Sequence, residues 1–401
     1  MKKNILLVFP GFSVSVDEGA KHRLNSFINE YSKLGFSITV LAFCKQGLFL
    51  KNRNQYLNSK AKWILFPYIL PMSRNIFLFN ILLMYLKFFL ALISRLKKFD
   101  IIQMEVFSIG SWLCRKNSYY ITDFHGDSFH EFIEMNGISD KHWYAKAILR
   151  IQRDSLKFSN YCICVSENLR IQLETNTQEK IDNYGIVSCG VDVSCFEGIT
   201  APSEYISKLS NRLVLGYSGG LQKWQNIDKI IQLVIRLREI DSSVYLMICT
   251  NHSIEPYEKL LLQLGRENYT VLSLKAGDVP SYLKLFDAGF LLRDNWILNK
   301  VSSPTKICEY LAAGVPVICT RFSGDYTRSV FSCVTGFILN ETNITQEELI
   351  GLYKWLHIVK TERIIVEEKC RMQVVERLFN TEFLVAYSKM LFLELRLVLT
   401  E

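Results

Sequence analysis

One short segment in the C-terminal half combines a cation, a carboxylate and the signals of a helix. Ser303 is a typical N-cap residue, Pro304 suits the first helical position, and Gly314 suits the position after the last one. Unpaired N–H groups at a helix start attract anions, and Lys306 adds a full positive charge in the first turn. Glu309 shares a face with Lys306 because it follows three residues later. The pattern predicts a site for a nucleotide diphosphate and its ribose; an ordinary capped helix with an ion pair is the alternative.

A second candidate is a glycine turn between an apolar run and a helix-period segment. Ser218, Gly219 and Gly220 follow the run Leu213–Tyr217, and a helix is expected from Ile227 to Arg238. Two glycines at such a turn let the backbone approach a phosphate or a sugar closely. Lys223 could neutralise the same diphosphate. A simple tight turn is the alternative.

Two further candidates lie in the N-terminal half. The segment Thr122–Asp127 ends an apolar run and carries His125 next to a glycine, which favours a functional over a purely structural histidine. The loop 11–23 follows the first apolar run, and its Gly19 suits contact with an acceptor. A structural histidine and a mobile surface loop are the respective alternatives.

The elements expected to position these residues are short apolar runs that alternate with helical segments. Such strands, buried on both faces, indicate parallel sheets. The apolar runs form two series, one in each half of the chain. They predict an α/β protein of two Rossmann-like, doubly wound domains facing across a cleft, with ligands at the carboxyl ends of the strands. We expect one domain over residues 1–200, joined by a C-terminal helix at about 380–401, a linker near 196–211, and a second domain over 210–380. The expected strands are 5–9, 37–43, 100–104, 119–124, 161–165, 213–217, 244–249, 269–274, 289–292 and 315–320.

Composition excludes several classes of protein. The 401 residues are 49% hydrophobic and carry a net charge of +8, which excludes a disordered chain and suits phosphates or an anionic membrane. No dense basic run interleaves with aromatics, so nucleic acid is not an expected partner. The 11 cysteines lie scattered in apolar runs, and no CxxC pair or HExxH-like spacing occurs, so we expect reduced thiols, a cytoplasmic location and no metal site.

One apolar stretch, Ile76–Ser94, raises the question of a membrane. Asn80 and Lys87 interrupt it, and Arg95, Lys97 and Lys98 follow it. A charge near its centre disfavours a membrane span. We expect a helix packed on protein, with a helix lying in the membrane interface as the first alternative and a true span as the second.

The ordered set of motifs resembles the GT-B glycosyltransferases of the large retaining family that includes many bacterial capsule, lipopolysaccharide and exopolysaccharide enzymes. Two further segments carry the resemblance, 164–169 (CVSENL) and 188–196 (SCGVDVSCF), together with Glu309 and the run 312–317 (AAGVPV). The likeness extends over almost the whole chain.

The resemblance implies roles for individual residues. Glu309 matches the glutamate that holds the ribose, Gly219 and Gly220 match the turn near the diphosphate, and His125 matches the histidine near the transferred sugar. The remaining expected donor-site residues are Ser218, Ser303, Thr305 and Lys306, with Lys223 as a second cation and Gly19 in the N-terminal loop. One departure stands out: the family has another glutamate eight positions before the ribose glutamate, where this chain has Val301.

The function implied is transfer of a sugar from a nucleotide-sugar donor to a glycan or lipid-linked acceptor, with retention, in surface polysaccharide synthesis. The resemblance implies metal-independent catalysis without a cofactor, in which Lys306, Lys223 and the helix start stabilise the leaving diphosphate. The expected location is cytoplasmic, with peripheral contact at the inner membrane face. Two alternatives stay open: a nucleotide-sugar epimerase, and a degenerate transferase that binds a nucleotide or glycan without turnover.

Overall fold

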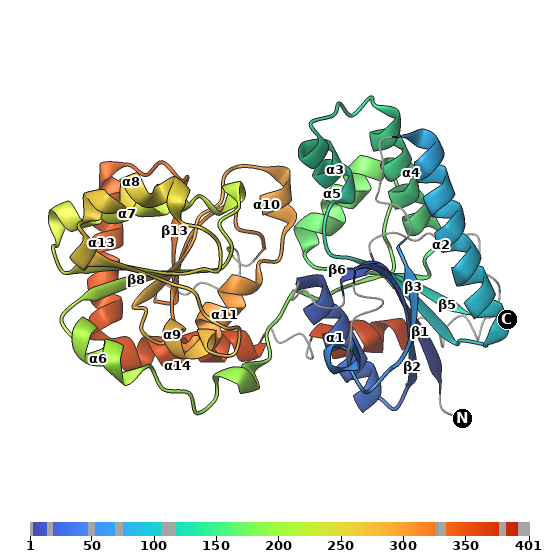
Figure 1. The fold of residues 1–401 in the computed structure, drawn as a ribbon, viewed down its shortest axis with the longest axis horizontal. Helices are drawn as coiled ribbons and strands as arrows, with labels where there is room; N and C mark the ends of the chain where they lie inside the picture. Colours follow the sequence, from blue (N-terminus) through green and yellow to red (C-terminus); the bar gives the residue numbers. More distant parts are fainter. Residues whose placement is uncertain are drawn as a thin grey trace. The chain divides into compact units, whose positions relative to one another are not determined.

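Two parallel β-sheets, each covered by helices, make up the computed structural model of the chain (Figure 1). It describes residues 3–13, 19–46, 53–68, 75–105, 118–325, 327, 334–376 and 382–391. The chain divides into a first unit, Met1–Ser188 with Phe379–Glu401, and a second unit, Cys189–Leu378. The stretch expected as a linker, 196–211, contains helix α6 (Ser203–Leu209), which has its own glutamate in the first turn and lysine in the last. The change of unit falls earlier, at Ser188–Cys189.

The first sheet has seven strands in the order β3-β2-β1-β4-β5-β6-β7, and every pair is parallel. Its strand order reverses between β1 and β4, which is the switch point where ligands of doubly wound folds bind. The strands are β1 (Asn4–Ser13), β2 (Ser37–Gln46), β3 (Lys62–Pro67), β4 (Ile101–Glu105), β5 (Tyr119–Phe124), β6 (Tyr161–Cys164) and β7 (Tyr184–Ile186).

Alternating side chains of these strands fill two separate apolar layers. Ile5 and Leu7 pack with helix α1 (Gly19–Lys33) and with a helix at 382–391, which returns from the far end of the chain. Leu6 and Val8 face the opposite layer, which contains helix α2 (Ile76–Leu96). The remaining helices of this unit are α3 (Ser128–Asn136), α4 (Trp143–Phe158) and α5 (Glu167–Thr177).

Helix α2 spans the apolar stretch of the sequence and extends two residues beyond Ser94. Asn75 caps it by accepting hydrogen bonds from the N–H groups of Phe77 and Leu78. It is the one helix among the described residues that is long and apolar enough to cross a membrane by length and composition. Leu82, Leu86 and Leu90 are nevertheless buried in the core of the first unit, as the expectation of a helix packed on protein requires.

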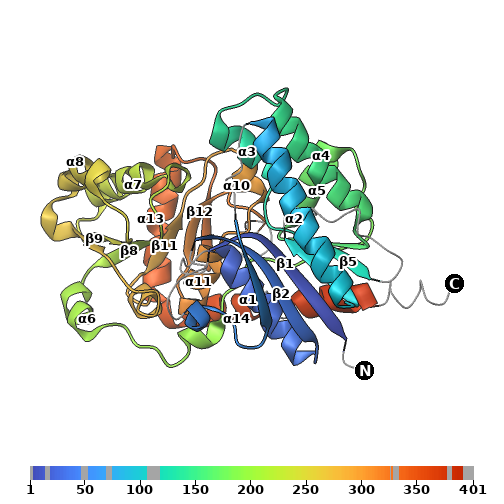
Figure 2. The ribbon, with the colours of Figure 1, turned by 45° about the vertical axis from the view of Figure 1, so that its right-hand side comes forward.

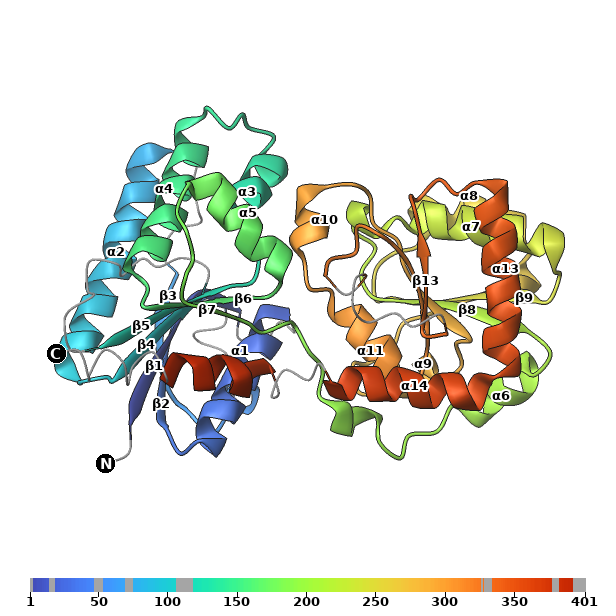
Figure 3. The same ribbon diagram turned by 180° about the vertical axis from the view of Figure 1, so that it is seen from behind.

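The second sheet has six parallel strands in the order β10-β9-β8-β11-β12-β13, and its order reverses between β8 and β11. The strands are β8 (Leu213–Ser218), β9 (Val244–Cys249), β10 (Tyr269–Leu272), β11 (Ala288–Leu291), β12 (Val317–Thr320) and β13 (Gly336–Leu339). The helices are α7 (Ile227–Ile240), α8 (Glu258–Leu261), α9 (Val279–Leu283), α10 (Ile297–Val301), α11 (Thr305–Ala313), α13 (Gln346–Thr361) and α14 (Arg363–Glu376), of which Figure 3 shows α13 and α14 from behind.

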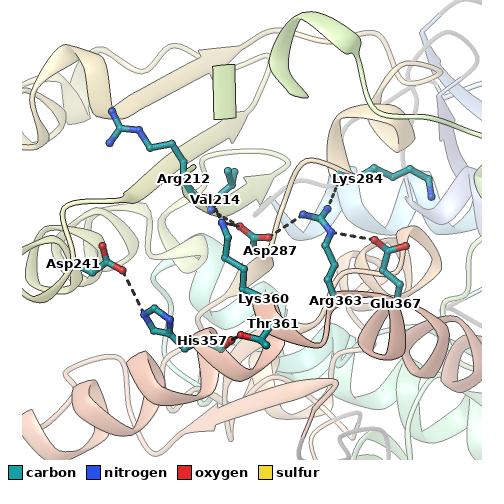
Figure 4. A network of polar contacts seen from close by, with 10 residues as sticks. All are labelled: Arg212, Val214, Asp241, Lys284, Asp287, His357, Lys360, Thr361, Arg363 and Glu367. Atoms are coloured by element: carbon teal, nitrogen blue, oxygen red, sulfur yellow. Dashed lines mark hydrogen bonds and ion pairs between the residues drawn. The ribbon is translucent and has the colours of Figure 1, made fainter. Parts of the chain in front are cut away.

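A buried carboxylate ties α13 and α14 to this sheet (Figure 4). Asp287 precedes β11 and accepts a hydrogen bond of 2.7 Å from the N–H of Val214. Its oxygens lie 3.3 Å from Lys360 Nζ and 3.0 Å from Arg363 Nη1. Two cations and one backbone donor therefore satisfy a charge that would be costly to bury alone.

These sheets confirm the expected α/β fold with two Rossmann-like domains. All ten expected strands are present, with ends that differ by a few residues. Strands β3, β7 and β13 were missed, because β3 and β13 are partly exposed edge strands and β7 has three residues. The predicted C-terminal helix appears as α14 and the helix at 382–391; residues 377–381 and 392–401 lie outside the described residues. The cleft expected between the domains stays a prediction.

Candidate functional site

The predicted helix at the candidate diphosphate site exists as α11, but it begins one residue later than expected. Pro304 is its N-cap and Thr305 its first helical residue, so the prediction that Ser303 caps the helix was wrong. The Ser303 hydroxyl instead accepts a 2.9 Å hydrogen bond from the N–H of Cys189. A proline cannot cap with its side chain, so the first turn of α11 has no side-chain acceptor for its N–H groups. The helix ends at Gly314 in the left-handed conformation, as predicted.

The glycine turn after β8 lies directly against Lys306. Gly219 has a φ of +133°, and a Cβ atom there would come within 2.4 Å of Lys306 Cε and 2.8 Å of its Nζ. The hydroxyl of Tyr217 donates a hydrogen bond to the carbonyl of Gly220 and so fixes the turn. The sequence placed these residues at neighbouring strand ends, and the structure brings Gly219 and Lys306 together.

Lys306 extends into a poorly solvated place without an ion-pair partner. Its Nζ lies 3.4 Å from the side-chain oxygen of Gln225 and 5.6 Å from the centre of the Tyr217 ring. Burial lowers the pKa of Lys306 to about 8; Arg293 lowers it further, and Glu309 opposes the shift. A lysine that is costly to keep charged is a marker of a functional site.

Arg293 is the functional candidate that the sequence reasoning missed. It follows β11 by two residues and is only 7% exposed. Its Nη1 donates a 2.7 Å hydrogen bond to the carbonyl of Trp224, whereas its Nε has no hydrogen-bond partner. Burial lowers the pKa of Arg293 to about 10. The available signal was a cation directly after a buried strand, at the edge where ligands bind.

Together these residues form a candidate anion site at the switch point of the second sheet. Gly219 follows β8 and Arg293 follows β11, the two strands between which the order reverses. In the described part of the chain, neither Lys306 nor Arg293 forms an ion pair with a carboxylate. One buried and one half-buried positive charge without such a partner favour an anionic ligand.

A small open pocket adjoins the glycine turn. Its volume is about 200 Å³, and Ser218, Gly219 and Gly220 line one side, with Thr250 and Asn251 after β9 on another. This is smaller than a typical site for a whole small-molecule ligand. The pocket is therefore suited to one part of a larger ligand whose phosphates reach Lys306.

The other predicted residues of this unit differ in their surroundings. Ser218 is buried, and its N–H donates a 2.9 Å hydrogen bond to the hydroxyl of Tyr310. Glu309 is half-buried on α11 and acts on Lys306 through its charge. Lys223 is exposed in the short turn Lys223–Gln225, so the buried cation beside Lys306 is Arg293 rather than Lys223.

The position at which the resemblance expects a further glutamate is apolar and buried. Val301 is 3% exposed at the end of α10. Its neighbour Asn299 is also buried and donates a 2.9 Å hydrogen bond to the carbonyl of Asp294. Val301 therefore offers no polar group to a sugar, and the side-chain amide nitrogen of Asn299 is engaged in its own loop.

In the first unit, His125 lies at the carboxyl end of β5. Its Nδ1 is 3.2 Å from an oxygen of Glu105, at the end of β4, and 29% of its side chain is exposed. Burial lowers the pKa of His125 to about 4, with the nearby Asp123 opposing the shift and Arg23 adding to it. The imidazole is therefore neutral at physiological pH and suited to hydrogen bonding rather than to carrying charge.

The aspartates beside His125 have structural tasks. Asp123 makes two hydrogen bonds of 2.6 and 2.7 Å with Arg23, in a buried ion pair. Asp127 caps α3 and accepts a 2.9 Å hydrogen bond from Asn176. Gly19 is the first residue of α1; residues 14–18 of its loop lie outside the described residues.

Over the described ranges, no group of three or more His, Cys, Asp or Glu residues is arranged to hold a metal ion.

The two sheets have the two-domain architecture of the GT-B fold, which confirms the fold expected from the resemblance. Residues 204–356, within the second unit, match the family model described as glycosyl transferases group 1. No curated protein sequence matches the chain significantly.

Solved structures with the same fold cover nearly the whole chain. A glycosyltransferase from Rickettsia africae superposes with a TM-score of 0.68 at 17% identity, over 97% of this chain and 99% of that one. HepE from Anabaena, solved in complex with UDP, gives a TM-score of 0.69 at 15% identity, over 97% and 100% of the two chains. WaaG, a glycosyltransferase involved in lipopolysaccharide biosynthesis, gives 0.66 at 14% identity, over 96% and 98%.

Proposed function

We propose that the chain transfers a sugar from a nucleotide-sugar donor, bound by its diphosphate in the second unit, to a glycan or lipid-linked acceptor in surface polysaccharide synthesis. The observation that carries the proposal is the pair of half-buried Lys306 and buried Arg293 beside the Gly219 turn, which have no carboxylate partner among the described residues. The UDP complex of HepE and the role of WaaG in lipopolysaccharide synthesis support the same class of donor and product.

In the proposed reaction, the bond between the anomeric carbon and the diphosphate oxygen breaks, and a bond from that carbon to an acceptor hydroxyl forms. The leaving diphosphate keeps the electron pair and accepts the proton of the acceptor hydroxyl, which suits a reaction with retention. Preorganised cations at the position of developing charge stabilise such a transition state by a few kcal/mol each. Lys306, Arg293 and the first-turn N–H groups of α11 would perform this task without a metal or cofactor.

The remaining residues have binding roles in this proposal. Glu309 would accept hydrogen bonds from the ribose hydroxyls, because it lies one helical turn from Lys306. Gly219 and Gly220 would allow the diphosphate to approach the backbone. Neutral His125 would contact the transferred sugar from the first unit, and Gly19 would lie near the acceptor.

A second candidate function is a degenerate transferase that binds a nucleotide or glycan without turnover. The specific observation in its favour is the buried Val301 at the position of the missing glutamate. Such a protein would keep the anion site and lose part of the contact with the donor sugar.

The test is turnover by the purified chain with a panel of UDP-, GDP-, ADP- and CMP-linked sugars, read as release of the nucleotide in the presence of acceptor extracts. We expect release with one donor and a fall of about 10² or more in Lys306→Ala. Nucleotide binding without release would favour the degenerate transferase, and a converted sugar without an acceptor would favour the epimerase. Unchanged turnover in both Lys306→Ala and Glu309→Ala would refute the site.

A further inference from the structure

Helix α2 has two apolar faces, of which only one is used by the fold. Leu82, Leu86 and Leu90 are fully buried in the first unit. Phe77, Met84 and Phe88 are between 62% and 70% exposed, although they are equally apolar. At 100° per residue these two sets lie on opposite sides of the helix.

The exposed residues form a continuous line along the helix. The line consists of Phe77, Met84, Phe88 and Leu92, spaced so that they fall on one face, and Leu96 adds a large exposed side chain near its end. Figure 2 shows α2 running along the outside of the first unit. An apolar stripe of this length on a surface helix marks an interaction site.

The charged residues of the α2 segment itself have one sign. Between residues 75 and 98 the chain has four basic residues and no acidic one. Lys87 lies midway along the helix and is half-buried, whereas Arg95 and Lys98, at the end of the helix, are exposed. A helix with an apolar stripe and only basic charges of its own complements a surface that is apolar inside and anionic outside.

The packing of α2 in the first unit limits how this helix can contact such a surface. Because Leu86 and Leu90 belong to the core, α2 cannot leave the first unit to span a bilayer without dismantling that core. It can lie parallel to a bilayer, with its outer face in the boundary between headgroups and acyl chains and its cations against the headgroups. Phenylalanine and methionine then enter the apolar layer while arginine and lysine remain at its edge.

We propose that the outer face of α2 binds the surface of an anionic phospholipid bilayer, with Phe77, Met84, Phe88 and Leu92 inserted and Arg95 and Lys98 pairing with lipid phosphates. This surface needs neither donor nor acceptor, so its failure would leave the proposed transferase activity untouched. It would hold the first unit at the membrane, where a lipid-linked acceptor is found.

The test is sedimentation of the full chain with vesicles of phosphatidylcholine alone and with an equal share of phosphatidylglycerol. We expect binding to the anionic vesicles, little to the neutral ones, and weakening as NaCl rises. Met84→Gln combined with Phe88→Gln should weaken binding by about tenfold or more, since both side chains lose their apolar burial. Arg95→Gln combined with Lys98→Gln should weaken it by about twenty-five-fold, from about fivefold for each charge near the surface.

Matched control variants show whether vesicle binding depends on the outer face of α2 or on any exposed apolar or basic side chain. Ile364 and Met372 on α14 are 84% and 60% exposed, so Ile364→Gln with Met372→Gln removes as much exposed apolar surface elsewhere. Lys259→Gln with Lys369→Gln removes two exposed charges outside α2. Both controls should bind vesicles like the parent chain, and circular dichroism confirms that each variant is folded.

Three results would overturn the proposal. The first is no binding to anionic vesicles, and the second is equal binding to neutral and anionic ones. The third is a dimer of the parent chain in solution that the Met84→Gln, Phe88→Gln variant abolishes, since the stripe would then be an interface with a second copy.

Discussion

Binding of a nucleoside diphosphate should draw a proton onto Lys306 at alkaline pH. Burial holds the pKa of this lysine at about 8, so it loses its charge as the pH rises through that value in the free protein. A diphosphate against Nζ would favour the charged form and return the pKa towards the ordinary 10.5. Each pKa unit corresponds to about 1.4 kcal/mol, so full restoration couples ligand and proton by about 3 kcal/mol.

The expected uptake follows from the protonation state of the free protein. At pH 8 about half of the Lys306 side chains are uncharged, so binding takes up about half a proton; at pH 9 the figure approaches one, and at pH 6.5 it is close to zero. The terminal phosphate of the ligand has a second pKa of about 6, so its own titration contributes little to the proton uptake above pH 8. Titration calorimetry with UDP, GDP and ADP, in buffers of different ionisation enthalpy, measures the number of protons directly.

The control is Lys306→Arg, because a guanidinium stays charged over the whole range. This variant should still bind the nucleotide but take up almost no proton at pH 8 to 9. The same uptake in the variant, or tight binding by the parent chain without any uptake, would refute the assignment of Lys306 to the diphosphate.

Three further predictions concern single residues. Gly219→Ala should weaken nucleotide binding by about tenfold or more, because its φ of +133° disfavours a side chain and the new Cβ would collide with Lys306; calorimetry measures the loss. Asp287→Asn should lower the free energy of unfolding of the second unit by about 3 kcal/mol, since two cations lose their buried partner; urea denaturation measures this. The depressed pKa of His125 means that the folded state binds fewer protons than the unfolded state between about pH 4 and 6.5, so stability should rise with pH there, by about 2 kcal/mol from pH 5 to 7, and His125→Gln should remove this rise.

Each of these three predictions has a matched comparison. Gly277→Ala places a Cβ in open space and should leave binding unchanged. Glu368→Gln removes an exposed carboxylate of α14 and should leave stability unchanged. Full nucleotide affinity in Gly219→Ala would contradict the geometry of the turn, and an Asp287→Asn protein as stable as its control would contradict the role of the buried network. If the His125→Gln protein shows the same pH dependence of stability as the parent chain, another group causes that dependence.

The fold was predictable because both sheets are built from strands that are apolar on both faces. Runs such as Val244–Cys249 are buried throughout, and this continuous burial is what the sequence displays. The edge strands β3 and β13 are only partly buried, and β7 is only three residues long, so none of the three showed that continuous burial. Helix α6 was taken for a linker because seven residues carry too little periodicity.

The candidate site was predictable in part for a topological reason. Gly219 and Lys306 are far apart in the chain, but Gly219 follows β8 and Lys306 lies at the start of α11, which leads from neighbouring β11 to β12 in the same parallel sheet. What the sequence could not supply is which cations are buried. Lys223 stands next to the glycine turn yet is exposed, whereas Arg293 is buried because its guanidinium reaches back to the carbonyl of Trp224.

The hydrogen-bond partners of individual hydroxyl and carboxyl groups could not be predicted from the sequence either. Ser303 has the residue type of an N-cap, but its hydroxyl accepts from the N–H of Cys189, more than a hundred residues away. Asp127 stands beside His125 in the sequence, but it is buried as the cap of α3. Such contacts depend on packing between distant segments, which local spacing does not encode.

The most direct measurement of the central claim is a crystal structure of the chain with a bound nucleoside diphosphate. The account predicts that the diphosphate lies within hydrogen-bond distance of Lys306 Nζ and of the first-turn N–H groups of α11, beside Gly219. A nucleotide bound elsewhere, with Lys306 still directed at Gln225 and away from any phosphate, would contradict it.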